Sequence, residues 1–253
     1  MKLVKLFLST LLFITISRAQ ILEVWSQTFG GSGSEVAYSV QQTSDGGFIL
    51  AGRTYSFGNG EGDAWLIKTD ANGTEEWNQT FGGTQSESAS SVQQTSDGGY
   101  ILAGVTQSFG NGWDDAWLIK TDANGTEEWN QTFGGYDEDY AFSAQQTSDG
   151  GYILAGRTSS FGNGGAEVWL IKTDANGIQE WNQTFGGSTS QYARSVQQTS
   201  DGGYIMAGRN SSIGNGGYDF WPIKTDVNGT EEWNQTIGGT SNEYPYFVQQ
   251  TSD

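Results

Sequence analysis

The fold is decided by residues 77–128, WNQTFGGTQSESASSVQQTSDGGYILAGVTQSFGNGWDDAWLIKTDANGTEE, because this stretch recurs along the chain with a period of 52 residues. A tryptophan opens each copy and shows that no insertion interrupts the period: Trp25, Trp77, Trp129, Trp181 and Trp233. The copies span residues 25–76, 77–128, 129–180, 181–232 and, in part, 233–253. A fixed period of this size is typical of propellers, solenoids and other repeat architectures.

Each copy contains four short runs that favour β-strands. In the first copy these are residues 37–43, 48–54, 64–70 and 74–81, rich in aromatic and β-branched side chains and bounded by Gly, Asn, Asp and Ser. Residues 44–47 and 70–73 predict tight hairpin turns, in which the glycines supply positive φ and both Asn72 and Gly73 are left-handed. No stretch has a helical apolar period of useful length.

Four antiparallel strands in a repeat of about 40–50 residues predict an all-β fold, the β-propeller, in which each repeat is one four-stranded blade. Residues 48–51 and 64–67 are nearly continuous apolar runs, as expected for strands covered on both faces by neighbouring blades. A β-solenoid is the alternative, but its coils are usually shorter and lack two tight hairpins per repeat.

The pattern DGGYILAG…WLIKTDANG…W resembles the propeller repeats of secreted and surface proteins in bacteria and archaea. It is more distantly similar to pyrroloquinoline-quinone-type propeller repeats, in which a D-x-x-x-G-x-x-x-W stretch docks a tryptophan between blades. The matching positions here are Asp70, Gly73 and Trp77 and their equivalents, at a different spacing. The resemblance covers residues 22–253 and implies the architecture. It implies no redox cofactor, because no cofactor-binding residue of that family has a match.

The predicted strands do not divide into a whole number of blades. Four complete blades are expected over about residues 35–238, preceded by a lone fourth-type strand at residues 22–29 and followed by a lone first-type strand at residues 244–251. We therefore expect an open arc or a fragment of a larger propeller, with a truncated gene as the leading explanation.

The N-terminus and the composition limit where the protein works and what it binds. Residues 1–19 have a positive start, an apolar centre and small residues before Gln20, which predicts a cleaved export signal and a secreted, periplasmic or cell-surface protein. No later apolar run approaches the about 20 residues that span a bilayer, so a transmembrane protein is not expected.

The composition excludes several functions. The 253 residues include 11 basic and 29 acidic side chains and carry a net charge of −18, which excludes a typical nucleic-acid binder. Without Cys or His there are no disulfides, thiol nucleophiles or His-based triads.

The two ends of each predicted blade differ in how much the copies vary. The first and third connections hardly change, whereas the second connections and the links between copies vary, and these two variable kinds of loop are expected on one rim. The predicted ligand-binding residues of this rim are aromatic or acidic: Tyr55, Asp63, Trp113, Asp115, Tyr136, Asp139, Glu167, Tyr218 and Asp219. Such side chains are typical of sugar and peptide binding, and they are also common in loops.

The recurring acids allow more than one interpretation. They could ring a cation, and the negative charge would favour calcium; the alternative, which we prefer, is that each carboxylate accepts hydrogen bonds from loop N–H groups. Paired carboxylates are also the catalytic groups of glycosidases. Because acids occur in every copy and no copy stands out, we assign no catalytic residue, no metal ligand and no cofactor.

The sequence favours a binding or structural module whose ligand is an extracellular glycan, a peptide or a surface protein, contacted by the variable rim. A carbohydrate-active enzyme, a hydrolase or lyase that uses rim carboxylates, is the second hypothesis, and a lectin is the third. Gln41 and Gln42, with their equivalents, are expected beside the central channel, where their amides satisfy each other.

Overall fold

The computed structural model describes residues 26–211 and 216–251. In these ranges the secondary structure consists of sixteen β-strands in four antiparallel sheets, which confirms the predicted all-β class and the four strands per copy. The predicted export signal, residues 1–19, lies outside the described residues. The described residues also contain no helix with the length and hydropathy needed to cross a bilayer.

Each sheet is a meander whose strands pair in sequence order. The first sheet consists of β1 (Glu35–Gln42), β2 (Phe48–Thr54), β3 (Asp63–Thr69) and β4 (Glu75–Phe81). The second consists of β5 (Glu87–Gln94), β6 (Tyr100–Thr106), β7 (Asp115–Thr121) and β8 (Glu127–Phe133). The third consists of β9 (Asp139–Gln146), β10 (Tyr152–Thr158), β11 (Glu167–Thr173) and β12 (Gln179–Phe185). The fourth consists of β13 (Gln191–Gln198), β14 (Tyr204–Asn210), β15 (Asp219–Thr225) and β16 (Glu231–Asn234).

The hairpin turns differ from the expectation in one respect. Gly73 has a φ of +78°, but Asn72 is not left-handed, since every positive φ among the described residues belongs to a glycine. The Asp70 carboxylate accepts the N–H groups of Asn72 and Thr74, both at 2.8 Å. It thereby holds a three-residue loop between Asp70 and Thr74, in which the N–H of Gly73 donates to the Asp70 carbonyl, and a two-residue turn with Asn72 left-handed is not formed.

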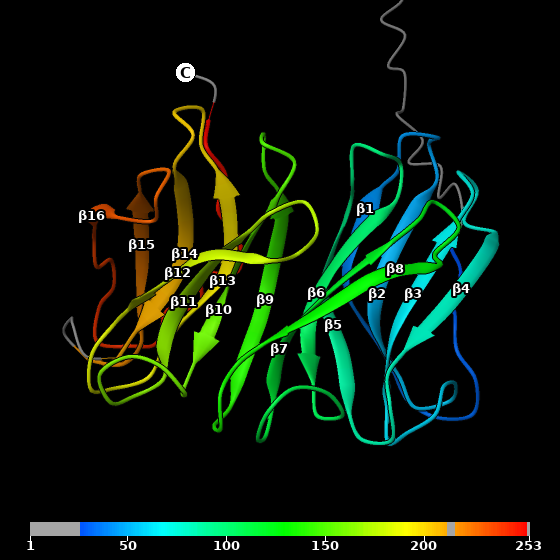
Figure 1. Ribbon diagram of the computed structural model, residues 1–253, viewed down its shortest axis with the longest axis horizontal. Coiled ribbons are helices and arrows are strands. Elements are labelled where there is room, and N and C mark those ends of the chain that lie inside the picture. Colours follow the sequence, from blue (N-terminus) through cyan, green and yellow to red (C-terminus); the bar gives the residue numbers. More distant parts are fainter. Residues whose placement is uncertain (1–25, 212–215, 252–253) are drawn as a thin grey trace, which may run out of the picture.

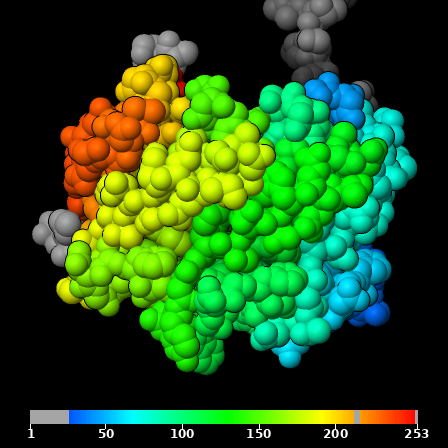
Figure 2. Space-filling view, viewed as in Figure 1, coloured from blue at the N-terminus to red at the C-terminus, as the bar shows by residue number. Residues whose placement is uncertain are grey.

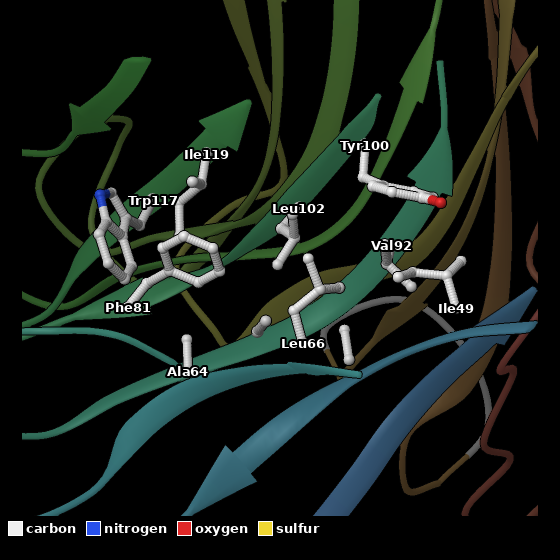
Figure 3. Close-up of a cluster of buried hydrophobic side chains, with 11 residues drawn as sticks. Ile49, Ala64, Leu66, Phe81, Val92, Tyr100, Leu102, Trp117 and Ile119 are labelled. Carbon is white, nitrogen blue, oxygen red and sulfur yellow. The ribbon is translucent and has the colours of Figure 1, made fainter. Parts of the chain in front are cut away.

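The four sheets follow one another around the molecule like blades (Figure 1). In the space-filling view, segments of successive colour lie next to one another over the visible face (Figure 2). At the first junction Leu66 and Phe81 of the first sheet meet Leu102 and Trp117 of the second, and Figure 3 shows these buried side chains pointing toward one another. Equivalent residues form the second and third junctions. A middle strand such as β7 is therefore buried at every residue, as its continuous apolar run predicts.

A tryptophan from the fourth strand of each of the first three sheets packs against the next sheet. The ring of Trp77 lies 5.8 Å from that of Tyr100 and packs against the first apolar cluster. It also rests on Gly125, where an added Cβ would come within 2.6 Å of the indole. Gly125 is thus required twice, by its φ of +79° and by this contact. The docked tryptophan implied by the family resemblance is present.

The arc of blades is open. The innermost strands β1, β5, β9 and β13 lie beside one another in that order, but the first and fourth sheets do not close into a ring. Val40 on β1 is consequently 64% exposed, whereas its equivalent Val92, covered by the first sheet, is 7% exposed. The flanking segments predicted as lone strands form no strand in their described residues, because they lack the neighbours with which to pair. Residues 244–251 nevertheless lie beside β13, and Val248 N–H donates to Ser195 Oγ there.

A buried lysine ties three parts of each blade together. Lys120 on β7 is 3% exposed, and its Nζ donates to Asp97 of the first hairpin at 2.9 Å and to Glu128 on β8 at 2.8 Å. The third hydrogen bond goes to the carbonyl of Thr121. Burial alone would raise the pKa of Asp97, but hydrogen bonds from Thr95 and Lys120 outweigh it and lower that pKa to about 2. The same tie recurs at the other three lysines of the repeats: Lys68, Lys172 and Lys224.

We predict that Lys120→Met destabilises the protein by about 2 kcal/mol. This lies between the cost of breaking an exposed pair and that of breaking a fully buried one, because the two carboxylates left behind are about half exposed and can be hydrated. Urea unfolding followed by tryptophan fluorescence measures the change. Glu128→Gln, which leaves Asp97 paired, should lower the midpoint much less, and equal effects of the two variants would contradict the tie.

Candidate functional site

The variable loops gather at one end of the blades, as predicted. The N–H of Glu87, where a link between copies ends, donates to the carbonyl of Gly62 in the second connection of the preceding blade at 2.7 Å, and Asp139 and Asp114 repeat this contact at 2.6 Å. We call this the variable end. It comprises the described residues of the second connections, 55–62, 107–114, 159–166, 211 and 216–218, and the links, residues 82–86, 134–138, 186–190 and 238–242.

The five predicted acids of the variable end are buried at the starts of strands. Four of them begin third strands and one begins a first strand: Asp63, Asp115, Glu167, Asp219 and Asp139. The carboxylates of four of them cap loops: Asp115, for example, accepts the N–H of Asn111 at 2.8 Å, and Asp139 accepts the N–H of Gly135 at 2.9 Å. The preferred interpretation of the acids, capping of loop N–H groups, is confirmed for these four, whereas Asp219 Oδ1 has no partner among the described residues.

These acids also meet in pairs across the junctions between blades. Asp115 and Asp139, which are 1% and 0% exposed, both lie against Gly134, whose added Cβ would come within 1.9 Å of Asp115 Oδ1 and 2.9 Å of Asp139 Oδ2. Burial raises the pKa of Asp115 to about 6, the neighbouring Asp139 adds to the rise, and the hydrogen bond from Asn111 opposes it. At the next junction the partner of Glu167 is an amide, Gln191, so this junction holds one carboxyl group in place of two.

We predict that Asp115→Asn stabilises the protein at pH 7.5 by on the order of 2 kcal/mol and by about half as much at pH 5. A carboxyl whose pKa is raised in the folded state contributes stability below its unfolded pKa of 3.8, and this contribution is lost as the pH rises through about 6. The amide removes that loss while its oxygen still accepts the Asn111 N–H.

Urea unfolding of the variant and the parent protein at the two pH values tests this prediction. Glu167→Gln is the matched control, because Glu167 faces Gln191 and no paired carboxylate. At pH 7.5 Asp115→Asn should stabilise the protein more than Glu167→Gln does. A gain for Asp115→Asn that is the same at both pH values would contradict the raised pKa of Asp115.

The four predicted aromatic residues have different surroundings. Trp113 and Tyr136 are 67% and 77% exposed, and they belong to a second connection and a link that contact each other, since an added Cβ on Gly112 would meet the Tyr136 carbonyl. Tyr55 is exposed beside Arg53, whose guanidinium lies 4.3 Å from its ring centre. Tyr218 lies under Arg209 at 3.7 Å. The aromatic side chains are thus the accessible part of the predicted site.

The innermost strands enclose a channel that opens at the variable end. Its cavity of about 890 Å³ is lined by β1, β5, β9 and β13 and by residues 246–248. The innermost strands begin at the variable end and finish at the first hairpins, so their opening residues form the mouth of the channel on that side.

A β-bulge in each innermost strand turns one side chain into this channel. The pairing of β9 with β10 skips Phe142, so that Ala141 and Ala144 both face the core and Phe142 lines the cavity. The bulge brings the Tyr140 carbonyl so close to Gly156 that an added Cβ would lie 1.8 Å from it, which explains the glycine of the ILAG motif. The equivalent bulge residues of the other sheets are Tyr38, Ser90 and Arg194.

Arginine and aromatic side chains cluster at the mouth of the channel. Arg194 lies 5.1 Å from the ring centres of both Phe142 and Tyr192, and Arg209 lies 4.1 Å from that of Tyr192. We call the following residues the arginine–aromatic cluster: Tyr140, Phe142, Tyr192, Arg194, Arg209, Tyr244 and Tyr246. The sequence analysis missed this cluster, although the copies differ at these positions, reading VAY, SAS, YAF, YAR and YPY at the start of the first strand.

The glutamine pairs beside the channel are satisfied, although not by each other. Gln41 Oε1 accepts the N–H of Gln94 on the next innermost strand at 2.6 Å, and Gln94 Oε1 accepts the N–H of Ser44 at 2.8 Å. The same two bonds recur at the following junctions, including the one between β13 and residues 244–251. The expectation that amides pair with amides is wrong, because the backbone N–H groups on the open side of each innermost strand need these acceptors.

The carboxylates that the structure describes do not gather into a group suited to a metal ion. Within residues 26–211 and 216–251, no three acidic side chains converge on a common point.

Comparison with known proteins adds information on the fold. No protein-family model matches the chain. The regulatory protein FlaEY of Caulobacter vibrioides is 28% identical over 199 residues, which make up 65% of this chain and 21% of that protein. The chain therefore spans about a fifth of the length of this curated relative, and the similarity concerns one part of it.

Solved structures resemble the chain at low sequence identity. A Dyadobacter fermentans protein of unknown function aligns with a TM-score of 0.54 and 12% identity, over 82% of this chain and 64% of that one, which supports a propeller-like repeat fold. A candidate glycoside hydrolase from Parabacteroides distasonis aligns with a TM-score of 0.39 and 12% identity over 81% of this chain and 72% of that one. This likeness is too weak to carry an argument about activity.

Proposed function

We propose that the protein is an exported binding module of the β-propeller type that holds its ligand at the variable end. The observation that supports this proposal is where the copies differ. The side chains of the junctions, hairpins and lysine ties recur in every copy, whereas the bulge residues at the channel mouth and the rim loops change. Constant packing that carries a varied, partly exposed surface is the usual arrangement of a binding site on a rigid scaffold.

The contact surface in this proposal joins two regions. The arginine–aromatic cluster lies at the mouth of the channel, and the rim loops beside it carry exposed aromatic rings such as Trp113 and Tyr136. Tyr140 connects the two regions, because its hydroxyl donates to Asp114 of a second connection at 2.5 Å. The ligand is an extracellular glycan, a peptide or a surface protein that reaches both the channel mouth and the rim.

Catalysis by the rim carboxylates has weaker support. A general acid has to come within hydrogen-bond reach of its substrate. Asp115 has the raised pKa that is typical of such an acid, yet Asp115 and its partner Asp139 are buried and engaged by loop N–H groups. These are the properties of groups that hold two blades together. A carbohydrate-active enzyme therefore stays the second hypothesis.

Glycan and peptide arrays probed with the secreted protein, with and without calcium, test the proposal. We predict that Phe142→Ser weakens binding of the selected ligand at least ten-fold, because the ring is removed from the channel mouth. The fold should tolerate this change, since serine occupies the equivalent bulge position at Ser90.

Ser148→Ala, at an exposed first hairpin on the opposite end, is the control and should bind like the parent protein. Equal loss in both variants would contradict a site at the channel mouth. Release of product from an arrayed glycan, abolished by Asp115→Asn, would establish the enzyme hypothesis in place of the binding one.

Export is proposed from residues 1–19 alone. We predict that the protein secreted by a bacterial host begins at Gln20, and that a charged residue at the small position before the cleavage site, Ala19→Glu, prevents processing. Mass spectrometry of the N-terminal peptide measures both outcomes. A chain lacking residues 2–19 should stay inside the cells, and efficient export of that chain would show that these residues are not the signal.

A further inference from the structure

Two arginines in the channel mouth have no acidic partner in the described part of the chain. The four repeat lysines each bind two carboxylates, and Arg157 pairs with Glu138. Arg194 and Arg209 form no such pair, although the chain has 29 acidic residues for 11 basic ones. Arg53 also has no acidic partner among the described residues, but it donates to Ser86 Oγ. What sets Arg194 and Arg209 apart is that they line one cavity together. Two such cations on one cavity of so acidic a protein point to an anion from outside it.

The two arginines line a separate small cavity. This cavity of about 300 Å³ is bounded by Tyr192, Arg194, Arg209 and residues 244–246. Arg194 and Tyr246 also line the channel cavity, so the small cavity lies next to the channel. Its size is at the lower end of that of small-ligand pockets, which suits one charged sugar ring or a group of similar size.

The surroundings of the guanidinium groups prepare them to bind a carboxylate. Arg209 lies 4.1 Å from the ring centre of Tyr192 and 3.7 Å from that of Tyr218, so two rings confine its guanidinium before any ligand arrives, and Arg194 lies beside Phe142 and Tyr192. A confined guanidinium loses little conformational entropy on binding, and it can donate two parallel N–H bonds to one carboxylate.

The remaining walls of the cavity suit a saccharide. Tyr246 is 70% exposed and Tyr244 is 51% exposed, so their rings offer flat apolar faces with a hydroxyl group at the edge. A pyranose ring has a matching apolar face and polar rim. An extended peptide would need free backbone partners, but the N–H groups of Val248 and Gln250 on this segment already donate to Ser195 and Gln197.

We infer that Arg194 and Arg209 bind the carboxylate of an acidic saccharide, a uronic acid, whose ring stacks on the tyrosines of the channel mouth. This inference rests on the proposed binding function and names its ligand class. The rim and the rest of the channel then contact the neighbouring sugar units.

Isothermal titration of the secreted protein with tetrasaccharides of galacturonic, glucuronic and mannuronic acid tests the inference. We expect one of them to bind, its neutral methyl ester to bind at least ten-fold more weakly, and 0.5 M NaCl to weaken binding of the acid. Arg194→Gln and Arg209→Gln should each reduce affinity ten-fold or more. Arg194 is exposed, so its variant is not expected to disturb folding.

Arg53→Gln is the matched control. Arg53 has the same strand position on β2 as Arg209 has on β14, but it lies over Tyr55 outside this cavity. Its variant should bind within two-fold of the parent protein, and unchanged melting temperatures would confirm that all variants fold.

Several results would overturn the inference. These are equal binding of the methyl ester, unaltered affinity of both arginine variants, binding of oligoglutamate in place of the uronates, or no binding of any uronate. If the protein binds a neutral glycan or a peptide, and Phe142→Ser abolishes that binding, the uronic acid is the wrong ligand class but the proposed binding function stands. Absence of any ligand at the channel mouth would contradict both.

Discussion

The structure depends on the burial of one sheet against the next. A four-stranded antiparallel sheet of this composition has two apolar faces, and neither is stable in water. Leu66 and Leu118 are fully buried because a neighbouring blade covers each of them. Removing such a side chain from water contributes about 1.5–3 kcal/mol, and each junction contains several of them. The turns, the lysine ties and the acids that cap loops add stability to sheets that this packing has already brought together.

The same packing determines what the variable end can present. Each bulge allows two small or apolar residues three positions apart, such as Ala141 and Ala144, to face the junction, and it sends the residue after the first of them into the channel. Gly156 makes the bulge possible by leaving room for the carbonyl of Tyr140. Residue 142 and its equivalents therefore lie outside the packed junctions, and this explains how serine, phenylalanine, tyrosine and arginine occupy one position of a nearly constant strand.

Much of the fold could be predicted from the sequence, because its determinants are local and repeated. The period of 52 residues, the apolar middle strands and the glycine turns indicate the blades, and the resemblance to known repeats implies the docking of Trp77. The site was harder to predict. A strand that alternates strictly would place Ala141 and Ser143 on one face, and the bulge breaks that rule, so the side chain of Phe142 could not be assigned to the channel. The burial of Asp63 and Asp115 could not be predicted for another reason. A carboxylate that caps a loop and a carboxylate that binds a ligand have the same spacing in a sequence.

Because the three junctions use equivalent residues, whole blades can be exchanged during evolution. The three junctions use equivalent residues, so the surface of one blade does not specify which blade follows it, and the covalent order of the chain alone does so. Unequal recombination between nearly identical copies would move a whole blade together with its bulge residue and leave every contact between sheets matched. The lining of the channel can thus be reordered in single steps without repacking the core, in contrast to a globular domain, where each new side chain at a site must be accommodated by its neighbours.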